Sequence, residues 1–121
     1  MIEKLFEWLE NSWSFQDIWE RGTNLDYVIS KNRISENLKK AIKEGNVDGF
    51  FLWVETEFQL EDIWNKGMDT FNKDQNDVTY NMTYYQFKVM FRNKIKETTI
   101  MEEPELAQNL FGGSADDFKS T

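Results

Sequence analysis

One short pattern occurs twice in the sequence, and this repetition limits the folds that the chain can adopt. The segment Asp17–Gly22 (DIWERG) returns 45 positions later as Asp62–Gly67 (DIWNKG). At the same offset, without a gap, seven of the twenty residue pairs from position 5 to position 24 are identical. Self-similarity at a fixed spacing indicates a repeated structural unit, and two copies are typical of a pseudo-symmetric domain, because open arrays need about three. We therefore expect a degenerate duplication with pseudo-repeats at about 1–45 and 46–96. Chance similarity in an aromatic-rich chain is the alternative.

The spacing of apolar residues indicates that the repeated unit is helical. Ile2, Leu5, Phe6, Leu9 and Trp13 follow the i, i+3, i+4, i+7, i+11 spacing of one helical face. The corresponding run in the second copy, at 50–54 (FFLWV), has the propensity of a buried strand. Because its counterpart has helical periodicity, the sequence predicts a helix at about 48–58 and an all-α fold.

Turn residues predict where the short repeated helix begins and ends. Ser14 followed by Asp17 is typical of a capping box, with Ser14 as the N-cap of a helix over 15–21. Gly22 supplies a residue that can adopt the left-handed conformation in which many helices end. Gly67 predicts the same stop in the second copy, and a polar linker at 72–77 follows it.

Three further helices complete the expected domain. Apolar residues at 25, 28 and 29 begin a helical pattern that ends at Gly45. Thr83 and Gln86 indicate a capping box ahead of a helix at about 84–96, and Pro104 favours a last helix at 103–111. We expect residues 1–111 to form a single helical domain and residues 112–121 to be a disordered tail.

The residue types that the chain lacks exclude most enzyme chemistry. The sequence has no cysteine and no histidine, so it has no disulfide, no thiolate metal site and no histidine general base. No phosphate-binding loop, dinucleotide-binding fingerprint or calcium loop is present, and the acids around Asp69–Asp77 lack the glycine and final glutamate of a calcium site. We therefore expect a protein that is not an enzyme, with no cofactor and no metal.

The charge and hydropathy of the chain limit its surroundings. A formal net charge of -8 opposes contact with phosphate, so we expect no nucleic-acid partner, although an acidic mimic of DNA that inhibits a host defence nuclease is an alternative function. No apolar run reaches the ~20 residues that a membrane span needs, and the N-terminus lacks the basic region followed by an apolar segment that is typical of a signal peptide. The sequence predicts a cytoplasmic protein without a membrane partner.

Aromatic residues supply the candidate binding surface. The chain holds 10 Phe, 5 Trp and 4 Tyr, and each ring removes about 150–250 Å² from water when buried, so a small domain has difficulty hiding all of them. For each single ring, a place in the core is the competing interpretation. A duplicated unit would present two matched apolar patches. Such patches fit an apolar helical partner in a groove and also favour homo-oligomers. The candidate partner-binding residues are Trp8, Trp13, Phe15, Trp19, Phe50, Phe51, Trp53, Phe58, Trp64, Tyr84 and Tyr85.

The segment Thr83–Phe91 (TYYQFKVMF) resembles the tail assembly chaperones of siphophages that infect Gram-positive bacteria. In length, acidity and aromatic content the whole chain is similar to the lactococcal members of that family. The resemblance implies an all-α protein that binds the apolar helical repeats of the tape measure protein and keeps it soluble during tail assembly. It also implies action in the cytoplasm of the infected host and absence from the mature virion. The resemblance supplies no catalytic residue.

Overall fold

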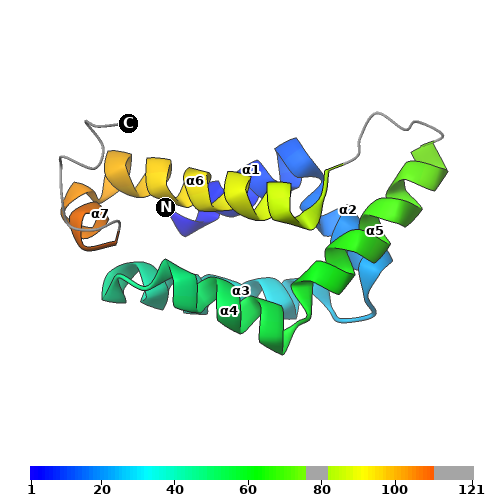
Figure 1. Ribbon diagram of the computed structural model, residues 1–121, viewed down its shortest axis with the longest axis horizontal. Helices are drawn as coiled ribbons and strands as arrows, with labels where there is room; N and C mark the ends of the chain where they lie inside the picture. The colour runs from blue at the N-terminus through cyan, green and yellow to red at the C-terminus, as the bar shows by residue number, and fades with distance from the viewer. Residues whose placement is uncertain (76–81, 111–121) are drawn as a thin grey trace.

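The computed structural model describes residues 1–75 and 82–110, and within these ranges the chain forms seven α-helices and no strand (Figure 1). The all-α prediction is therefore confirmed. The predicted tail at 112–121 lies outside the described residues. The helices are α1 (Ile2–Trp13), α2 (Phe15–Gly22), α3 (Tyr27–Glu44), α4 (Val47–Glu57), α5 (Leu60–Gln75), α6 (Tyr84–Glu102) and α7 (Pro104–Leu110).

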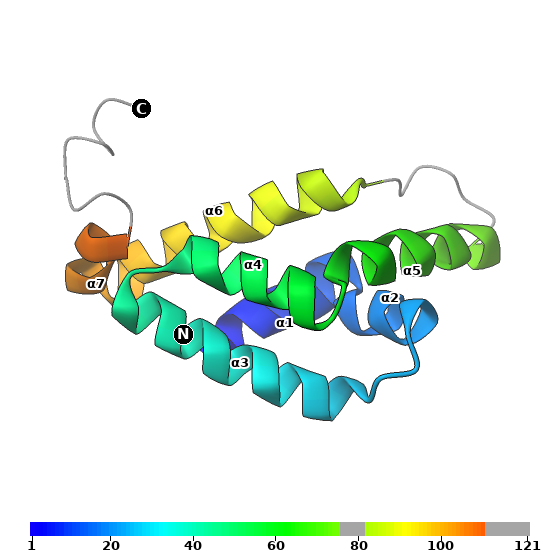
Figure 2. The same ribbon diagram turned by 60° about the horizontal axis from the view of Figure 1, so that its bottom comes forward.

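The first six helices form two layers around an aromatic core. Helices α1 and α6 make one layer, α3 and α4 make the other, and α2 crosses α5 at one end of the molecule (Figures 1 and 2). Between the layers, Phe87 of α6 stacks on Trp64 with the ring centroids 4.1 Å apart and on Phe15 at 5.8 Å. These contacts tie α6 to the crossing of α2 and α5.

Two glycines allow that crossing. A Cβ atom on Gly22 would lie 2.1 Å from the carbonyl oxygen of Ile63, and one on Gly67 would lie 2.1 Å from the carbonyl oxygen of Ile18. Neither glycine ends a helix in the left-handed conformation as predicted: Gly22 is the last helical residue before an extended cap at Thr23, and α5 continues past Gly67. The spacing of Ile and Gly that the two DIWxxG segments share therefore allows close helix packing.

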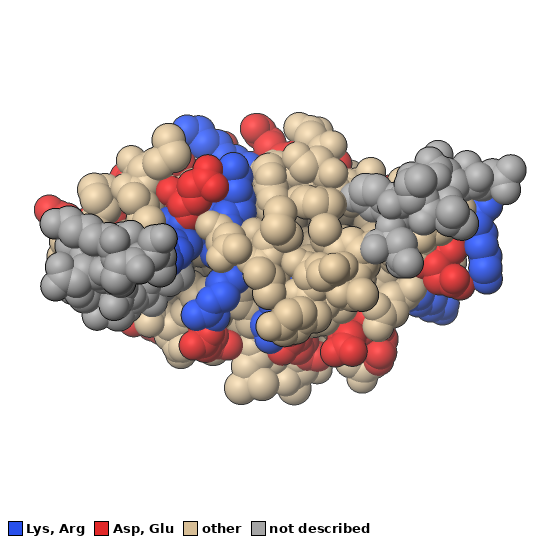
Figure 3. All heavy atoms as spheres, turned by 45° about the horizontal axis from the view of Figure 1, so that its top comes forward, with Lys and Arg blue, Asp and Glu red and all other residues tan. Residues whose placement is uncertain are grey.

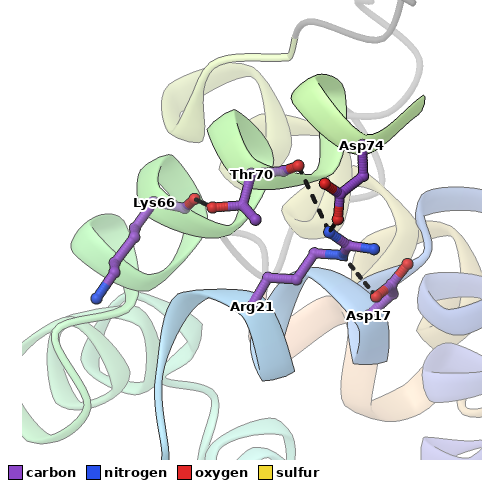
Figure 4. Close-up of polar contacts among 5 residues, drawn as sticks. All are labelled: Asp17, Arg21, Lys66, Thr70 and Asp74. Carbon is purple, nitrogen blue, oxygen red and sulfur yellow. Dashed lines mark hydrogen bonds and ion pairs between the residues drawn. The ribbon is translucent and has the colours of Figure 1, made fainter. Parts of the chain in front are cut away.

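Polar contacts close the same crossing on its outer side (Figure 4). Arg21 of α2 donates to the Asp17 carboxylate at 2.8 Å and to the carbonyl oxygen of Thr70 at 3.5 Å, and it pairs with the Asp74 carboxylate. Thr70 in turn donates to the carbonyl oxygen of Lys66 at 3.1 Å. These contacts hold the last turns of α5 against α2.

The junctions before α2 and α5 also differ from the prediction. Ser14 makes no capping hydrogen bond with its side chain and instead has φ 52°, in the left-handed region. Gln59 occupies the matching place before α5 and has φ 55°. A non-glycine residue in this region is uncommon. At both positions it turns the chain sharply between two consecutive helices.

The other helix boundaries follow the sequence closely. The run at 50–54 is helical, Gly45 ends α3 with φ 73°, and Thr83 and Gln86 form the predicted capping box. Helix α6 extends beyond its predicted end to Glu102. The predicted linker at 72–77 is wrong over 72–75, which belong to α5, while 76–77 lie outside the described residues. No helix in the described part of the chain is long and apolar enough to cross a membrane.

Buried tryptophans hold corresponding loops in place. The indole Nε1 of Trp19 donates to the carbonyl oxygen of Leu25 at 3.1 Å, just before α3 begins. The indole Nε1 of Trp64 donates to the carbonyl oxygen of Met82 at 2.8 Å, just before α6 begins. Trp19 thus fixes the approach to α3, and Trp64 fixes the approach to α6.

Two similar polar clusters lie at the edges of the core. The Tyr27 hydroxyl and the Lys31 ammonium donate to the Glu10 carboxylate at 2.6 and 2.8 Å. In the second cluster, the Tyr84 hydroxyl donates to the Glu55 carboxylate at 2.7 Å, and the Lys88 ammonium lies 2.8 Å from the same carboxylate. Glu10 and Glu55 are one of the identical pairs in the repeat.

Candidate interaction surface

Most of the aromatic residues assigned to a partner surface belong to the core. Trp19 and Trp64 are each 1% exposed, and their indole N–H groups already donate to backbone carbonyls. A ring enclosed in this way cannot touch a partner while the domain is folded. This corrects the assignment of the buried members of the set, which are Phe15, Trp19, Phe50, Phe51, Phe58, Trp64 and Tyr84.

Four members of the set reach the surface. Trp8, Trp13 and Trp53 are half-buried, and Tyr85 on α6 is 73% exposed. Trp8 and Trp53 are another identical pair of the repeat, so one half-buried tryptophan is presented by α1 and its counterpart by α4. Of the paired aromatic patches expected from the sequence, this is the pair that remains accessible.

The first candidate site lies between α1 and α6. The Trp8 and Trp13 rings meet edge to face at 6.0 Å, and Lys94 Nζ lies 5.7 Å from the centroid of the Trp8 ring. Met90, 40% exposed, precedes Lys94 by one turn on the same side of α6. We call Trp8, Trp13, Met90 and Lys94 the α1/α6 site. Figure 3, turned so that the layer of α1 and α6 comes forward, shows a broad uncharged area with basic and acidic side chains on its left and mainly acidic side chains below it.

A second site with the same components lies between α3 and α4. The Trp53 and Phe58 rings meet edge to face at 5.5 Å, and the guanidinium carbon of Arg33 lies 6.0 Å from the Trp53 centroid and 5.0 Å from that of Phe58. Ile29, 63% exposed, precedes Arg33 by one turn of α3. We call Ile29, Arg33, Trp53 and Phe58 the α3/α4 site.

The cation at each site pairs with an acid that is itself open to solvent. Lys94 lies 3.6 Å from Glu97, whose side chain is 62% exposed, and Arg33 lies 3.0 Å from Glu57, which is 47% exposed. Exposed ion pairs of this kind contribute only about 0–1 kcal/mol. A carboxylate from another molecule can therefore replace either acid at little cost.

Sequence reasoning missed part of the exposed apolar surface. Leu25, Val28 and Ile29 have the spacing of a helix, but none of them is buried: Val28 and Ile29 are each 63% exposed and Leu25 is 48% exposed. The inward face of α3 is taken by Tyr27, with Ile34 and Leu38 further along. The stripe starting at Tyr27 was visible in the sequence and would have identified Val28 and Ile29 as outward residues.

Several ionisable side chains line a hollow at the second polar cluster. A hollow beside Tyr84 is lined by Glu55 and Lys88, with Glu61 and Asp62 nearby. Burial alone would raise the pKa of Glu55, but hydrogen bonds from Lys88 and Tyr84 and the Lys88 charge lower it overall, so this carboxyl is held ionised. No group of three or more acids in the described ranges is placed to hold a metal ion.

Comparisons with protein-family models, with curated proteins and with solved structures find no match to this chain. Its function is therefore inferred from its own residues.

Proposed function

We propose that the protein is a non-enzymatic binding protein that holds an apolar helical segment of a partner and keeps that segment soluble. The observation that carries the proposal is the pair of half-buried tryptophans, Trp8 and Trp53, each set against an aromatic neighbour and beneath a cation. Tryptophan and arginine are enriched among the residues that contribute most to binding between proteins.

The geometry of each tryptophan suits it to binding. An indole held by an edge-to-face contact and a cation loses little freedom when a partner covers it, so more of the free energy of burial is retained in binding. The apolar side chains one turn away, Met90 and Ile29, extend each site along its helix. An amphipathic helix that projects apolar residues at i, i+3, i+4 and i+7 is the partner that such a surface fits.

The resemblance to siphophage tail assembly chaperones gives this partner a proposed identity. The apolar helical repeats of a tape measure protein have the required pattern, and the acidic remainder of the chain, with its net charge of -8, would keep a complex in solution. In this role the protein acts in the cytoplasm of the infected host and is absent from the mature virion. Contact between the apolar sites of separate copies would account for a homo-oligomer.

The proposal includes a degenerate duplication of a three-helix unit, α1–α3 and α4–α6. Several pairs of features support it: the positive φ of Ser14 and Gln59, the reciprocal contacts of Gly22 and Gly67, and the carboxylates of the two polar clusters. The buried residues of α3 and α6 also follow the same spacing along each helix. A duplicated unit explains why a half-buried tryptophan with an aromatic neighbour occurs twice, while the two cations, Arg33 and Lys94, come from positions of α3 and α6 that do not correspond.

A solubility experiment tests the proposed function. The probe is a synthetic helix of about 20 residues, some 30 Å long, with leucine and phenylalanine on one face, which precipitates alone at neutral pH. We expect equimolar protein to keep the probe in the supernatant and the double variant Trp8→Ala/Trp53→Ala to lose this activity. Met101→Ala, at a residue 76% exposed outside both sites, is the matched control and should act as the wild type. If the double variant, folded by circular dichroism, still keeps the probe soluble, the proposal is wrong.

A further inference from the structure

We propose that the protein is bivalent: the α1/α6 site and the α3/α4 site each bind one apolar helical segment that carries a carboxylate beside its apolar face. This inference rests on the proposed function and adds to it the number of bound segments and the charge that each must present.

The two sites are built from the same kinds of side chain. In each, a half-buried tryptophan meets a second aromatic ring at 5.5–6.0 Å, a cation lies 5.7–6.0 Å from the tryptophan centroid, and an exposed apolar residue precedes that cation by one turn. In each site the tryptophan comes from one helix and the cation from its neighbour in the same layer; Trp13 ends α1, and Phe58 is the residue that follows α4. A surface that binds an apolar helix at one of these positions has the means to do so at the other.

The two sites lie on different layers of the molecule. Each lies between the two helices of one layer, and the core separates the layers (Figures 1 and 2). A straight helix on the α1/α6 site therefore cannot also cover the α3/α4 site. Two segments are required, either from separate partner molecules or from one partner whose chain passes around the domain.

The cations at the two sites determine the charge that an occupant must carry. Both sites place a cation, Lys94 or Arg33, over the indole that the partner must cover. Covering the ring removes water from the cation, which is costly unless a carboxylate pairs with it. The acids now beside these cations, Glu97 and Glu57, are exposed and their pairing is weak. A glutamate or aspartate one turn from the apolar residues of the partner fits each site.

The two sites differ in openness, which predicts unequal affinities. In the α1/α6 site both rings, Trp8 and Trp13, are half-buried, whereas in the α3/α4 site Phe58 is buried at 6% exposed and only Trp53 reaches the surface. The α1/α6 site therefore presents two rings to a partner, and the α3/α4 site presents one. We expect it to bind the same segment more tightly.

Calorimetric titration with a soluble form of the helical probe, glutamates beside its apolar face, tests this inference on the full chain. We expect two probes per protein with unequal affinities. Trp8→Ala should abolish the tighter site and Trp53→Ala the weaker one, leaving one probe in each case, while Met101→Ala should retain both. A tandem probe with two segments joined by a long flexible linker should bind at least about tenfold more tightly than a single segment.

A charge exchange keeps the test independent of any loss of fold. Lys94→Glu should weaken binding of the glutamate probe at one site about tenfold, and a probe with lysines in place of glutamates should recover that binding. One probe per protein, with only one tryptophan affecting it, would overturn bivalency and leave the proposed function standing. If the probe does not bind to the wild-type protein at all, both bivalency and the proposed function are wrong. Sedimentation that shows dimers which Trp8→Ala dissociates but which excess probe does not would identify a second copy as the occupant of the α1/α6 site and overturn the inference.

Discussion

The α carbon of Gly22 lies so close to the carbonyl oxygen of Ile63 that a Cβ atom there would stand 2.1 Å from that oxygen. Because the obstructing atom belongs to the backbone of another helix, no side-chain rotation relieves the contact. Gly22→Ala must therefore push α2 and α5 apart, and we expect it to reduce the free energy of unfolding by about 1–3 kcal/mol or more. In an exposed helix the same change would stabilise by about 1 kcal/mol.

Gly49→Ala is the matched control for this prediction. The atoms that its Cβ would meet belong to the side chain of Asn46, which can rotate away at the loss of one capping hydrogen bond, about 1 kcal/mol. Urea unfolding of both variants measures the difference. Equal stability of Gly22→Ala and wild type would mean that the helices do not cross as closely as described.

Trp19 and Trp64 are expected to be required for folding. Each is buried and donates a hydrogen bond to a backbone carbonyl, so each change to alanine should cost about 3–5 kcal/mol. The double variant should be unfolded at 25 °C, because small domains are stable by only about 5–15 kcal/mol. Trp8→Ala, at a half-buried ring, should cost about 1 kcal/mol and serves as the comparison. Native circular dichroism in the double variant would place these indoles outside the core.

Stability should fall in acid because of two carboxylates. Burial alone would raise the pKa of Glu10, but hydrogen bonds from Lys31 and Tyr27 and the Lys31 charge lower it overall, and Glu55 behaves in the same way with Lys88 and Tyr84. A pKa that is lower in the folded state contributes stability above the unfolded value of about 4.5, and this contribution is lost as the pH falls through the folded value. Glu10→Gln/Glu55→Gln should be less stable than wild type at pH 7 and indistinguishable from it at pH 2.

Stability should also fall in strong alkali. Burial, followed by the hydrogen bond to Glu10, raises the pKa of Tyr27, and burial with the hydrogen bond to Glu55 raises that of Tyr84. Their contribution is complete below the unfolded pKa of about 10 and declines above it. Tyr27→Phe/Tyr84→Phe should flatten the alkaline side of a pH–stability curve measured by urea unfolding. A curve of unchanged shape would contradict the described contacts.

Helices could be predicted from this sequence where periodicity or capping was local. The Thr83 capping box and the Gly45 stop were accessible in this way. The helix at 50–54, whose own composition favours a strand, was accessible only through its counterpart in the first copy of the repeat. The role of Gly22 was not, because the atom that requires glycine belongs to Ile63, on a helix far along the chain. The left-handed Ser14 has the same origin: packing of the next helix outweighs the local preference for a cap.

The candidate surface was harder to predict than the fold, since composition shows that there are many rings without showing which ones are outside. Trp19 and Trp8 have the same side chain, and only the register of each helix against its neighbours separates a core residue from a surface residue. The position of Trp8 off the apolar stripe of its helix was the available signal. The cations over Trp8 and Trp53 come from distant segments and left no signal in the local sequence.

The most direct test of the central claim, that the half-buried tryptophans bind an apolar helix, is a fluorescence titration of the soluble probe at two salt concentrations. Salt from about 0.05 to 0.5 M screens charge pairs but does not weaken apolar burial. We expect wild type to bind the probe with an affinity that changes less than about tenfold, and Trp8→Ala/Trp53→Ala not to bind it at either concentration. Binding that disappears at high salt would contradict the account, because it would assign the binding to the pairing of the probe's glutamates with Lys94 and Arg33 instead of to the tryptophans. Binding that survives in the double variant would contradict it as well.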